Sequence, residues 1–249
     1  MKILVYIKRV PATEARLKIA DGGADIDPAG LKYVVSPYDE YALELALRLR
    51  EARGEGEVVV ATLGEPAAGE QLRAALAMGA DRAVLLRGGS TVDGLATARG
   101  LVPLVEAERP DLVLFGLKAV DDDQQQVGVF VAELVGLPCV TGVAEAEVGA
   151  GVVVCRREVE GGVEVVEAPL PAALTVTKGP YEPRYASLKG IMAAKKKPLE
   201  EREAVLGPGR IRVQALRYPP ERPPGRIVGH GPDAVPELVR LLREEAKVL

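Results

Sequence analysis

Short apolar runs alternate with amphipathic stretches over roughly the first 140 residues of the chain. The runs are continuous, as expected for strands buried on both faces of a parallel sheet. The amphipathic stretches repeat apolar residues at i, i+3, i+4 and i+7, which predicts helices with one buried face. This alternation predicts an α/β fold, a doubly wound and mostly parallel sheet with right-handed crossovers. The candidate strands are residues 3–7, 58–62, 83–86 and 112–115.

Capping signals mark where several predicted helices begin and end. Ser36 followed by Pro37 predicts a helix start, with serine at the N-cap and proline at the first helical position. Gly79 and Gly136 each follow an apolar helix face and predict a C-terminal end.

The pattern changes after residue 150. Residues 151–167 predict a β-hairpin that turns at Gly161-Gly162, and 170–176 predict a strand that returns to the main sheet. After Gly179 the chain is rich in proline until a last amphipathic helix near the carboxyl end. We therefore expect an α/β domain at 1–179 and, at 180–249, a loop and arm that wraps a partner subunit. The alternative is an arm folded back on its own domain.

Composition narrows the class of protein. With 249 residues, 48% hydrophobic and 27% charged, the chain can bury a full core. The net charge of −4 argues against a protein that coats nucleic acid. Two cysteines without C-x-x-C spacing, a short apolar start and no apolar run of about 18 residues predict a cytoplasmic protein without membrane insertion. The absence of asparagine beside abundant charge predicts a thermophilic source.

Motifs of self-sufficient catalysis are missing from the sequence. It has no G-x-G-x-x-G after the first strand and no G-x-x-x-x-G-K-[ST]. Its single histidine, His230, lies in the proline-rich arm, so neither a nucleophile–histidine pair nor a histidine metal site is expected. We therefore predict no catalytic residues and no metal site.

The turn after the fourth predicted strand is the best candidate for a small-molecule site. It runs from Gly116 to Val127, at the carboxyl end of a buried strand and before a helix, where parallel sheets bind ligands. Gly116 permits close approach, and free amides at the helix start favour a phosphate. The aspartates 121–123 would repel a phosphate unless they turn outward or share a cation. They are otherwise explained by Asp123 as a helix N-cap beside two solvated carboxylates.

A second feature is an apolar tip inside a basic rim at 181–197. Leu188, Ile191 and Met192 lie in a loop without helical periodicity, beside Arg184, Lys189 and three lysines at 195–197. Such a surface favours docking to another protein. A solvated loop that docks nothing is the alternative.

The order Glu182-Pro-Arg-Tyr-Ala-Ser-Leu, then Ile191-Met192, then Ala193-Ala-Lys-Lys-Lys resembles the signature of the beta subunits of electron transfer flavoproteins. The resemblance extends over nearly the whole chain and includes 76–82. It implies a heterodimer with an alpha subunit that holds most of the FAD site. It also implies docking to acyl-CoA dehydrogenases of fatty acid oxidation and electron delivery to a membrane quinone oxidoreductase. The implied docking residues are Tyr185, Leu188 as the anchor, Ile191 and Met192.

The same resemblance implies an adenine-nucleotide fold that binds AMP structurally, with two departures from the family pattern. Ser36 stands where the family has asparagine, and Lys118 where glutamine is usual. Relatives that bifurcate electrons carry a second FAD and usually have glycine at the position of Asp122, which favours AMP here. The implied AMP residues are Tyr6, Ser36, Pro37, Tyr38, Asp39, Leu63, Gly116, Leu117, Lys118, Ala119, Val120, Asp121, Asp122, Asp123, Gln124, Gln125, Gln126 and Val127.

The predicted hairpin carries one further implied residue. Cys155-Arg-Arg-Glu-Val-Glu-Gly-Gly resembles the family hairpin whose glutamate, here Glu158, forms ion pairs with the mobile flavin domain. An exposed charge worth well under about 1 kcal/mol is the alternative. Three other functions stay open: a bifurcating subunit with a second FAD, an ATP-binding or ATP-sensing domain, and a scaffold that binds no nucleotide.

Overall fold

The computed structural model describes residues 1–89, 93–221 and 224–249. The chain divides into two compact units, Met1–Ala215 and Leu216–Leu249. The first unit thus includes part of the segment that the sequence assigns to an arm. The second contains a short 3₁₀ turn, Pro232–Ala234, and the helix α6, Val235–Glu244.

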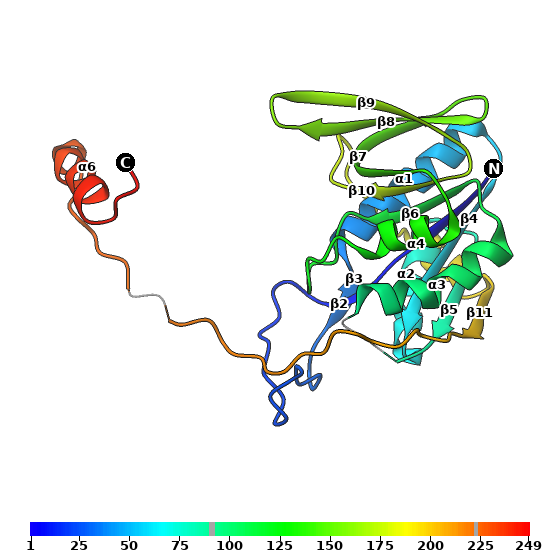
Figure 1. The fold of residues 1–249 in the computed structure, drawn as a ribbon, viewed down its shortest axis with the longest axis horizontal. Helices are drawn as coiled ribbons and strands as arrows, with labels where there is room; N and C mark the ends of the chain where they lie inside the picture. Colours follow the sequence, from blue (N-terminus) through cyan, green and yellow to red (C-terminus); the bar gives the residue numbers. More distant parts are fainter. Residues whose placement is uncertain (90–92, 222–223) are drawn as a thin grey trace. The chain divides into compact units, whose positions relative to one another are not determined.

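One sheet of nine strands forms the centre of the first unit, in the order β11-β5-β4-β1-β6-β10-β7-β8-β9 (Figure 1). From β11 to β7 neighbouring strands are parallel, and β8 and β9 continue the sheet antiparallel. The α/β, mostly parallel fold predicted from the sequence is confirmed. The bounds are β1 Lys2–Tyr6, β4 Glu57–Gly64, β5 Arg82–Arg87, β6 Leu112–Gly116, β7 Cys139–Val148, β8 Val152–Val159, β9 Gly162–Pro169, β10 Ala172–Val176 and β11 Leu199–Glu203.

Helices pack on both faces of this sheet and enclose two cores. Helices α1 (Pro37–Arg53) and α2 (Gly69–Met78, after a 3₁₀ turn at Pro66–Ala68) contribute leucines and alanines to one apolar cluster. Helices α3 (Gly94–Glu108) and α4 (Val127–Val135) contribute to the second, which also includes Tyr6 and Phe115. Strands with apolar side chains on both faces therefore follow from the doubly wound arrangement.

Five elements were not predicted from the sequence. A small ribbon, β2 (Arg9–Pro11) paired antiparallel with β3 (Tyr33–Val35), follows β1. Strands β7 and β11 join the main sheet, and helix α5 spans Leu188–Ala194. The prediction that Leu188, Ile191 and Met192 lie in an irregular loop was therefore wrong: they lie on a short helix capped by Ser187, whose Oγ accepts the Gly190 N–H at 3.0 Å.

Helix ends agree with the sequence signals, with two corrections. Gly79 and Gly136 end α2 and α4, and Ser36 precedes Pro37 at the start of α1. However, the Ser36 side chain accepts no capping hydrogen bond. Asp123 is not the N-cap of α4 either, because the N-cap position is taken by Gln126, three residues further along the chain.

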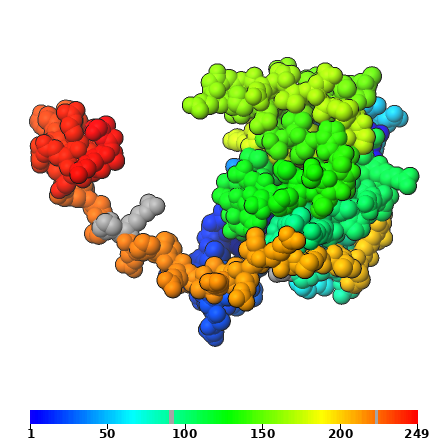
Figure 2. All heavy atoms as spheres, viewed as in Figure 1, coloured from blue at the N-terminus to red at the C-terminus, as the bar shows by residue number. Residues whose placement is uncertain are grey.

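The antiparallel hairpin β8–β9 extends one edge of the sheet. Figure 2 shows its tip projecting from the rest of the first unit. The outward side chains of β9 include Val163 and Val165, each about 60% exposed. The buried side of the hairpin includes Val153 and Cys155, which pack into the first core.

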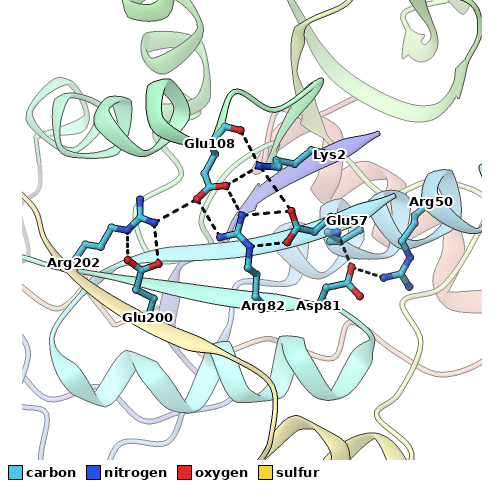
Figure 3. Close-up of polar contacts among 9 residues, drawn as sticks. Lys2, Arg50, Glu57, Asp81, Arg82, Glu108, Glu200 and Arg202 are labelled. Carbon is cyan, nitrogen blue, oxygen red and sulfur yellow. Dashed lines mark hydrogen bonds and ion pairs between the residues drawn. The ribbon is translucent and has the colours of Figure 1, made fainter. Parts of the chain in front are cut away.

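At the amino ends of the parallel strands, charged side chains form a dense network (Figure 3). Glu108, at the end of α3, pairs with Arg82, with Lys2 at 3.2 Å and with Arg202 at 3.6 Å. Arg82 also pairs with Glu57 at 2.7 Å. These side chains come from β1, β4, β5, β11 and α3, so the network ties distant segments together.

Candidate functional site

A cavity of about 580 Å³ lies at the carboxyl ends of the central strands. Tyr6, Leu63, Gly116 and Thr175 enter it from the ends of β1, β4, β6 and β10. The starts of α1, α3 and α4 and the β2–β3 ribbon complete its wall. This is the edge at which parallel sheets bind ligands, because the following helices begin there with free amides.

Two stacked aromatic rings form part of the cavity wall. Tyr6 and Phe115 lie with ring centroids 5.0 Å apart, and the Tyr6 hydroxyl donates to the Leu101 carbonyl at 2.8 Å. Burial raises the pKa of Tyr6 far above its usual value, so the hydroxyl stays protonated. Tyr6 therefore offers a ligand an apolar ring, since its polar atom is already engaged.

Asp39 joins the first turn of α1 to two strand ends. Its carboxylate accepts the Lys8 N–H at 2.7 Å and the Gly116 N–H at 2.9 Å. Burial raises the pKa of Asp39 to about 7, although these hydrogen bonds and the Lys8 charge favour the ionised form. A Cβ on Gly116 would lie 2.7 Å from the Asp39 backbone nitrogen. Only glycine fits this close approach.

The acidic turn after β6 is neutralised by lysines on both sides. Lys8 Nζ donates to Asp121 at 2.9 Å and to Asp122 at 2.8 Å, while Lys118 Nζ donates to Asp123 at 2.9 Å. Burial by itself lowers the pKa of Lys8, but the bonds to Asp122 and Asp121 outweigh it and raise the pKa. The repulsion expected between three aspartates and a phosphate is therefore largely offset inside the protein.

The backbone of the acidic turn has two unusual conformations before α4 begins. Asp123 and Gln125 adopt left-handed φ values of 51° and 56°, which non-glycine residues rarely do. Such alternation builds concave amide nests that bind anions. Helix α4 follows, has no side-chain cap, and places Val127 and Gly128 in the cavity wall. The uncapped start of α4 is therefore the element at this end of the cavity that favours an anion.

Arg9 is a cation of the cavity wall that no sequence signal singled out. Its guanidinium lies 3.4 Å from the centroid of the Tyr33 ring, across the β2–β3 ribbon. Its Nε is buried and has no hydrogen-bond partner, and no ion pair is formed by Arg9 within the described residues. Unlike Lys8 and Lys118, it is free to meet a ligand anion.

Most of the predicted AMP residues meet at this cavity, but five do not. Ser36, Pro37, Tyr38, Val120 and Asp123 are absent from its wall. Ser36 Oγ instead lies 3.5 Å from the Lys118 carbonyl, and Asp123 faces solvent. The predicted residues on the wall are Tyr6, Asp39, Leu63, Gly116, Leu117, Lys118, Ala119, Asp121, Asp122, Gln124, Gln125, Gln126 and Val127.

Sequence reasoning also missed part of the wall. Phe115 and Thr175 are the second-last residues of β6 and β10 and could have been found by the strand-end rule. The ribbon and its connection had no such signal, because their position depends on folding back over the cavity. The wall residues missed are Ile7, Lys8, Arg9, Pro11, Asp25, Ile26, Pro28, Tyr33, Gly64, Glu65, Ala68, Gly89, Gly94, Thr97, Leu101, Phe115, Gly128 and Thr175.

The predicted apolar tip is exposed, and its residues follow all the cavity-wall residues in the sequence. Tyr185 is 98% exposed, Leu188 84%, Met192 63% and Ile191 44%. Lys189 and the lysines at 195–196 are also exposed. The predicted basic rim needs one correction: Arg184 and Lys197 are bound to the protein itself and are not free at the surface.

Glu158 lies on the exposed hairpin, opposite Val163 in the β8–β9 register. Within the described residues no salt bridge is formed by its carboxylate. No helix in the described part of the chain is long and apolar enough to cross a membrane. The same residues contain no cluster of histidine, cysteine and carboxylate side chains that could hold a metal ion.

Comparison with known proteins gives a consistent result. A family model described as the electron transfer flavoprotein domain matches residues 25–206. An electron transfer flavoprotein subunit beta from Bradyrhizobium diazoefficiens is 40% identical over 252 residues that cover both chains completely. One from Syntrophomonas wolfei is 36% identical over 249 residues, covering this chain and 98% of the relative. The human protein of that name is 33% identical over 256 residues, covering this chain and 99% of its own length.

Proposed function

Because the chain belongs to the beta subunits of electron transfer flavoproteins, we propose that it accepts electrons from acyl-CoA dehydrogenases as one half of a cytoplasmic heterodimer. The alpha subunit holds most of the FAD, and this FAD supplies the electron-carrying chemistry when bound. Electrons then pass to a membrane quinone oxidoreductase. The chain itself converts no substrate: it completes the heterodimer, binds a nucleotide and docks the electron donor.

AMP is the nucleotide that we propose for the cavity. Its volume of about 580 Å³ lies within the roughly 300–1,000 Å³ of small-ligand sites. The adenine and ribose suit the aromatic and apolar wall around Tyr6 and Phe115, and the phosphate suits the amides at the start of α4. Arg9 supplies a cation that is not already paired with a carboxylate. These groups bind and orient the nucleotide, whose role is structural.

The test is to denature the purified heterodimer and to identify the released nucleotides by mass. We expect one FAD and one AMP per heterodimer. Two FAD per heterodimer would mean that a second flavin occupies the cavity in place of AMP and that the protein is a bifurcating subunit. One FAD with no other nucleotide would contradict the assignment of this cavity, and steady ATP hydrolysis by the chain would support an ATP-binding domain instead.

The exposed residues Tyr185, Leu188, Ile191 and Met192 are proposed to contact the dehydrogenase, with Leu188 as the anchor. Leu188 is 84% exposed, so its replacement leaves the fold intact. An apolar anchor removed from a docking patch typically costs about 2 kcal/mol or more of binding. Leu188→Ala should therefore slow electron acceptance from the dehydrogenase while the heterodimer and its FAD content stay unchanged. An unchanged dehydrogenase-coupled rate would remove the docking role.

Two other regions are proposed to contact the alpha subunit. Helix α6 leaves Val235, Leu238 and Val239 exposed on the arm, as an amphipathic helix does when its partner is another chain. Glu158 is proposed to form an ion pair with the flavin domain, because its carboxylate is exposed on the hairpin.

A further inference from the structure

The segment that leads into α5 is held to α1 by one arginine. Arg184 donates from Nε to Glu44 at 2.8 Å and from Nη2 to Glu44 at 3.1 Å, and its backbone N–H donates to the same carboxylate at 3.1 Å. Its guanidinium also pairs with Glu51, with Nη2 at 3.0 Å. The Glu44 side chain is only 1% exposed, so this is a buried carboxylate with a bidentate partner.

The residues before Arg184 follow the same face of α1. The Tyr41 hydroxyl donates to Glu182 at 2.9 Å, and the Arg48 guanidinium lies 4.7 Å from the centroid of the Tyr181 ring. On α1 the contacts fall at 41, 44, 48 and 51, the three- and four-residue spacing of one helix face. Residues 181–184 therefore form an upstream stem that is bound along nearly three turns of α1.

A second set of bonds holds the chain after α5. Arg73 Nη1 on α2 donates to the Ala194 carbonyl at 2.7 Å and to the Lys197 carbonyl at 2.8 Å. Lys197 Nζ donates back to the carbonyls of Leu76, at 3.0 Å, and of Ala80. A Cβ on Gly190 would collide with the Ala77 carbonyl, so the α5 backbone lies directly on the end of α2.

The downstream stem, residues 195–203, ends in the main sheet. Strand β11 pairs in parallel with β5, from Leu199 beside Ala83 to Glu203 beside Arg87. Arg202 on β11 reaches Glu108 at 3.6 Å and donates to Glu200 at 2.6 Å, which joins this stem to the amino-end network (Figure 3). Both stems are thus fixed by polar contacts to elements of the α/β core.

Between the stems, the tip at 185–193 has no comparable support from its apolar side chains. Tyr185, Leu188 and Met192 are each more than 60% exposed and bury little surface on the protein itself. Their placement therefore comes from the stems and from the contact of the α5 backbone with α2. From this geometry we infer that Arg184 and Arg73 are positioning residues that hold the docking tip in its binding conformation before the electron donor arrives.

This inference rests on the proposed docking function and concerns the conformational cost of binding the tip. A tip that is ordered in advance loses less conformational freedom on binding. Loosening a stem should therefore weaken the encounter with the dehydrogenase and leave electron transfer within the complex unchanged. The expected signature is a higher KM for the heterodimer with kcat preserved, and easier cleavage of the tip by a protease.

The experiment uses the purified FAD-loaded heterodimer and an acyl-CoA dehydrogenase from the same organism, reduced by its acyl-CoA substrate. Arg184→Gln should raise the KM for the heterodimer about fivefold to tenfold, with kcat within twofold. Trypsin should cut after Lys189 several times faster in this variant. Arg184→Lys should restore part of the loss, because lysine keeps the charge but not the bidentate geometry.

The matched control is Lys178→Gln. Lys178 pairs with Glu182 on the same stem at 3.5 Å, but both side chains are more than two-thirds exposed. It should leave KM and trypsin cleavage unchanged, because an exposed pair contributes little. If Arg184→Gln prevents assembly, Glu51→Gln weakens the outer contacts alone, since Arg184 keeps its bonds to Glu44. That variant should raise the KM about twofold.

Leu188→Ala distinguishes a failure of the docking function from a failure of the positioning role of the stems. If Leu188→Ala raises the KM but Arg184→Gln and Glu51→Gln do not, the tip docks without help from the stems and this inference is wrong. If neither Leu188→Ala nor the stem variants change the KM, the docking function itself is wrong. A fall in kcat with unchanged KM in Arg184→Gln would also overturn the positioning role.

Discussion

Charged side chains at the two ends of the same parallel strands differ in how fully they are paired within the protein. At the amino ends, Lys2 and Arg82 each pair with Glu108 and also with Glu57. At the carboxyl ends, lysines neutralise the aspartates after β6, but Arg9 keeps an unpaired buried nitrogen and α4 begins without a side-chain cap. The charged side chains of the amino end are paired with one another, whereas the carboxyl end keeps hydrogen-bond donors that a ligand can use.

The difference follows from the direction of the helices. In a doubly wound sheet each strand leads at its carboxyl end into a loop and then a helix start, whose amides and dipole favour anions. The amino ends receive helix ends, such as α3 at Glu108, where basic side chains are favourable. Ligand recognition is therefore expected at one end and mutual ion pairing at the other. Three substitutions test this comparison, ordered by their expected effect on stability.

Gly116→Ala should have the largest effect. The added methyl group would collide with the Asp39 carboxylate and lie 2.7 Å from its backbone nitrogen. Backbone must then move in a packed region, which we expect to cost about 3 kcal/mol. The thermal midpoint of the heterodimer should fall by several degrees, and the AMP content should fall with it.

Gly69→Ala is the matched control, because Gly69 has an ordinary helical φ of −57° and nothing within 4 Å of an added Cβ. It should leave stability within about 0.5 kcal/mol. If Gly116→Ala behaves like Gly69→Ala, the close approach of α1 to β6 is not required for the cavity.

Glu108→Gln tests the amino end and should have the second-largest effect. The amide cannot balance Arg82, Lys2 and Arg202, and removing one partner of a buried pair is strongly destabilising. Arg82 keeps Glu57, and its side chain is 22% exposed, so we expect about 2 kcal/mol. Thermal unfolding should show the loss, while the nucleotide content of the folded heterodimer stays unchanged.

Glu201→Gln provides the comparison for this variant. Glu201 pairs with Arg87 at 3.5 Å, and both side chains are about half exposed, so its loss should be barely measurable. Loss of AMP from folded Glu108→Gln heterodimers would show that the two ends do not act separately.

The sequence predicts some parts of the fold and of the candidate site but not others. The central strands and the turn at 116–127 follow from local periodicity and from the strand-end rule. The ribbon β2–β3 and strand β11 do not, because each is short and gains its structure from pairing with distant partners. One interpretation of the acidic turn was also wrong: Asp123 is not an N-cap, because it adopts a left-handed φ of 51° and Lys118 binds its carboxylate.

The amino-end network could not be predicted for a related reason. Lys2, Glu57, Arg82 and Glu108 are ordinary charged residues at element boundaries, and nothing local shows that they meet. The same holds for Arg184 and Glu44, which are 140 residues apart. By contrast, the resemblance of 182–197 to a docking segment was visible, because its residues are contiguous.

Arg9→Gln should have the smallest effect on stability and the most selective effect on the ligand. Arg9 has no carboxylate partner within the described residues, and its contact with the Tyr33 ring is worth about 1 kcal/mol or less. Removing a cation of the amino-end network would leave buried carboxylates without a partner. Removing Arg9 leaves no carboxylate unpaired. We therefore expect a nearly unchanged thermal midpoint and about tenfold weaker retention of AMP, measured by mass after dialysis.

Arg16→Gln, at an exposed position outside the cavity wall, should retain AMP normally. If Arg9→Gln lowers stability as much as Glu108→Gln and keeps its nucleotide, Arg9 serves the fold and not the ligand, and the contrast between the two ends fails at its central residue.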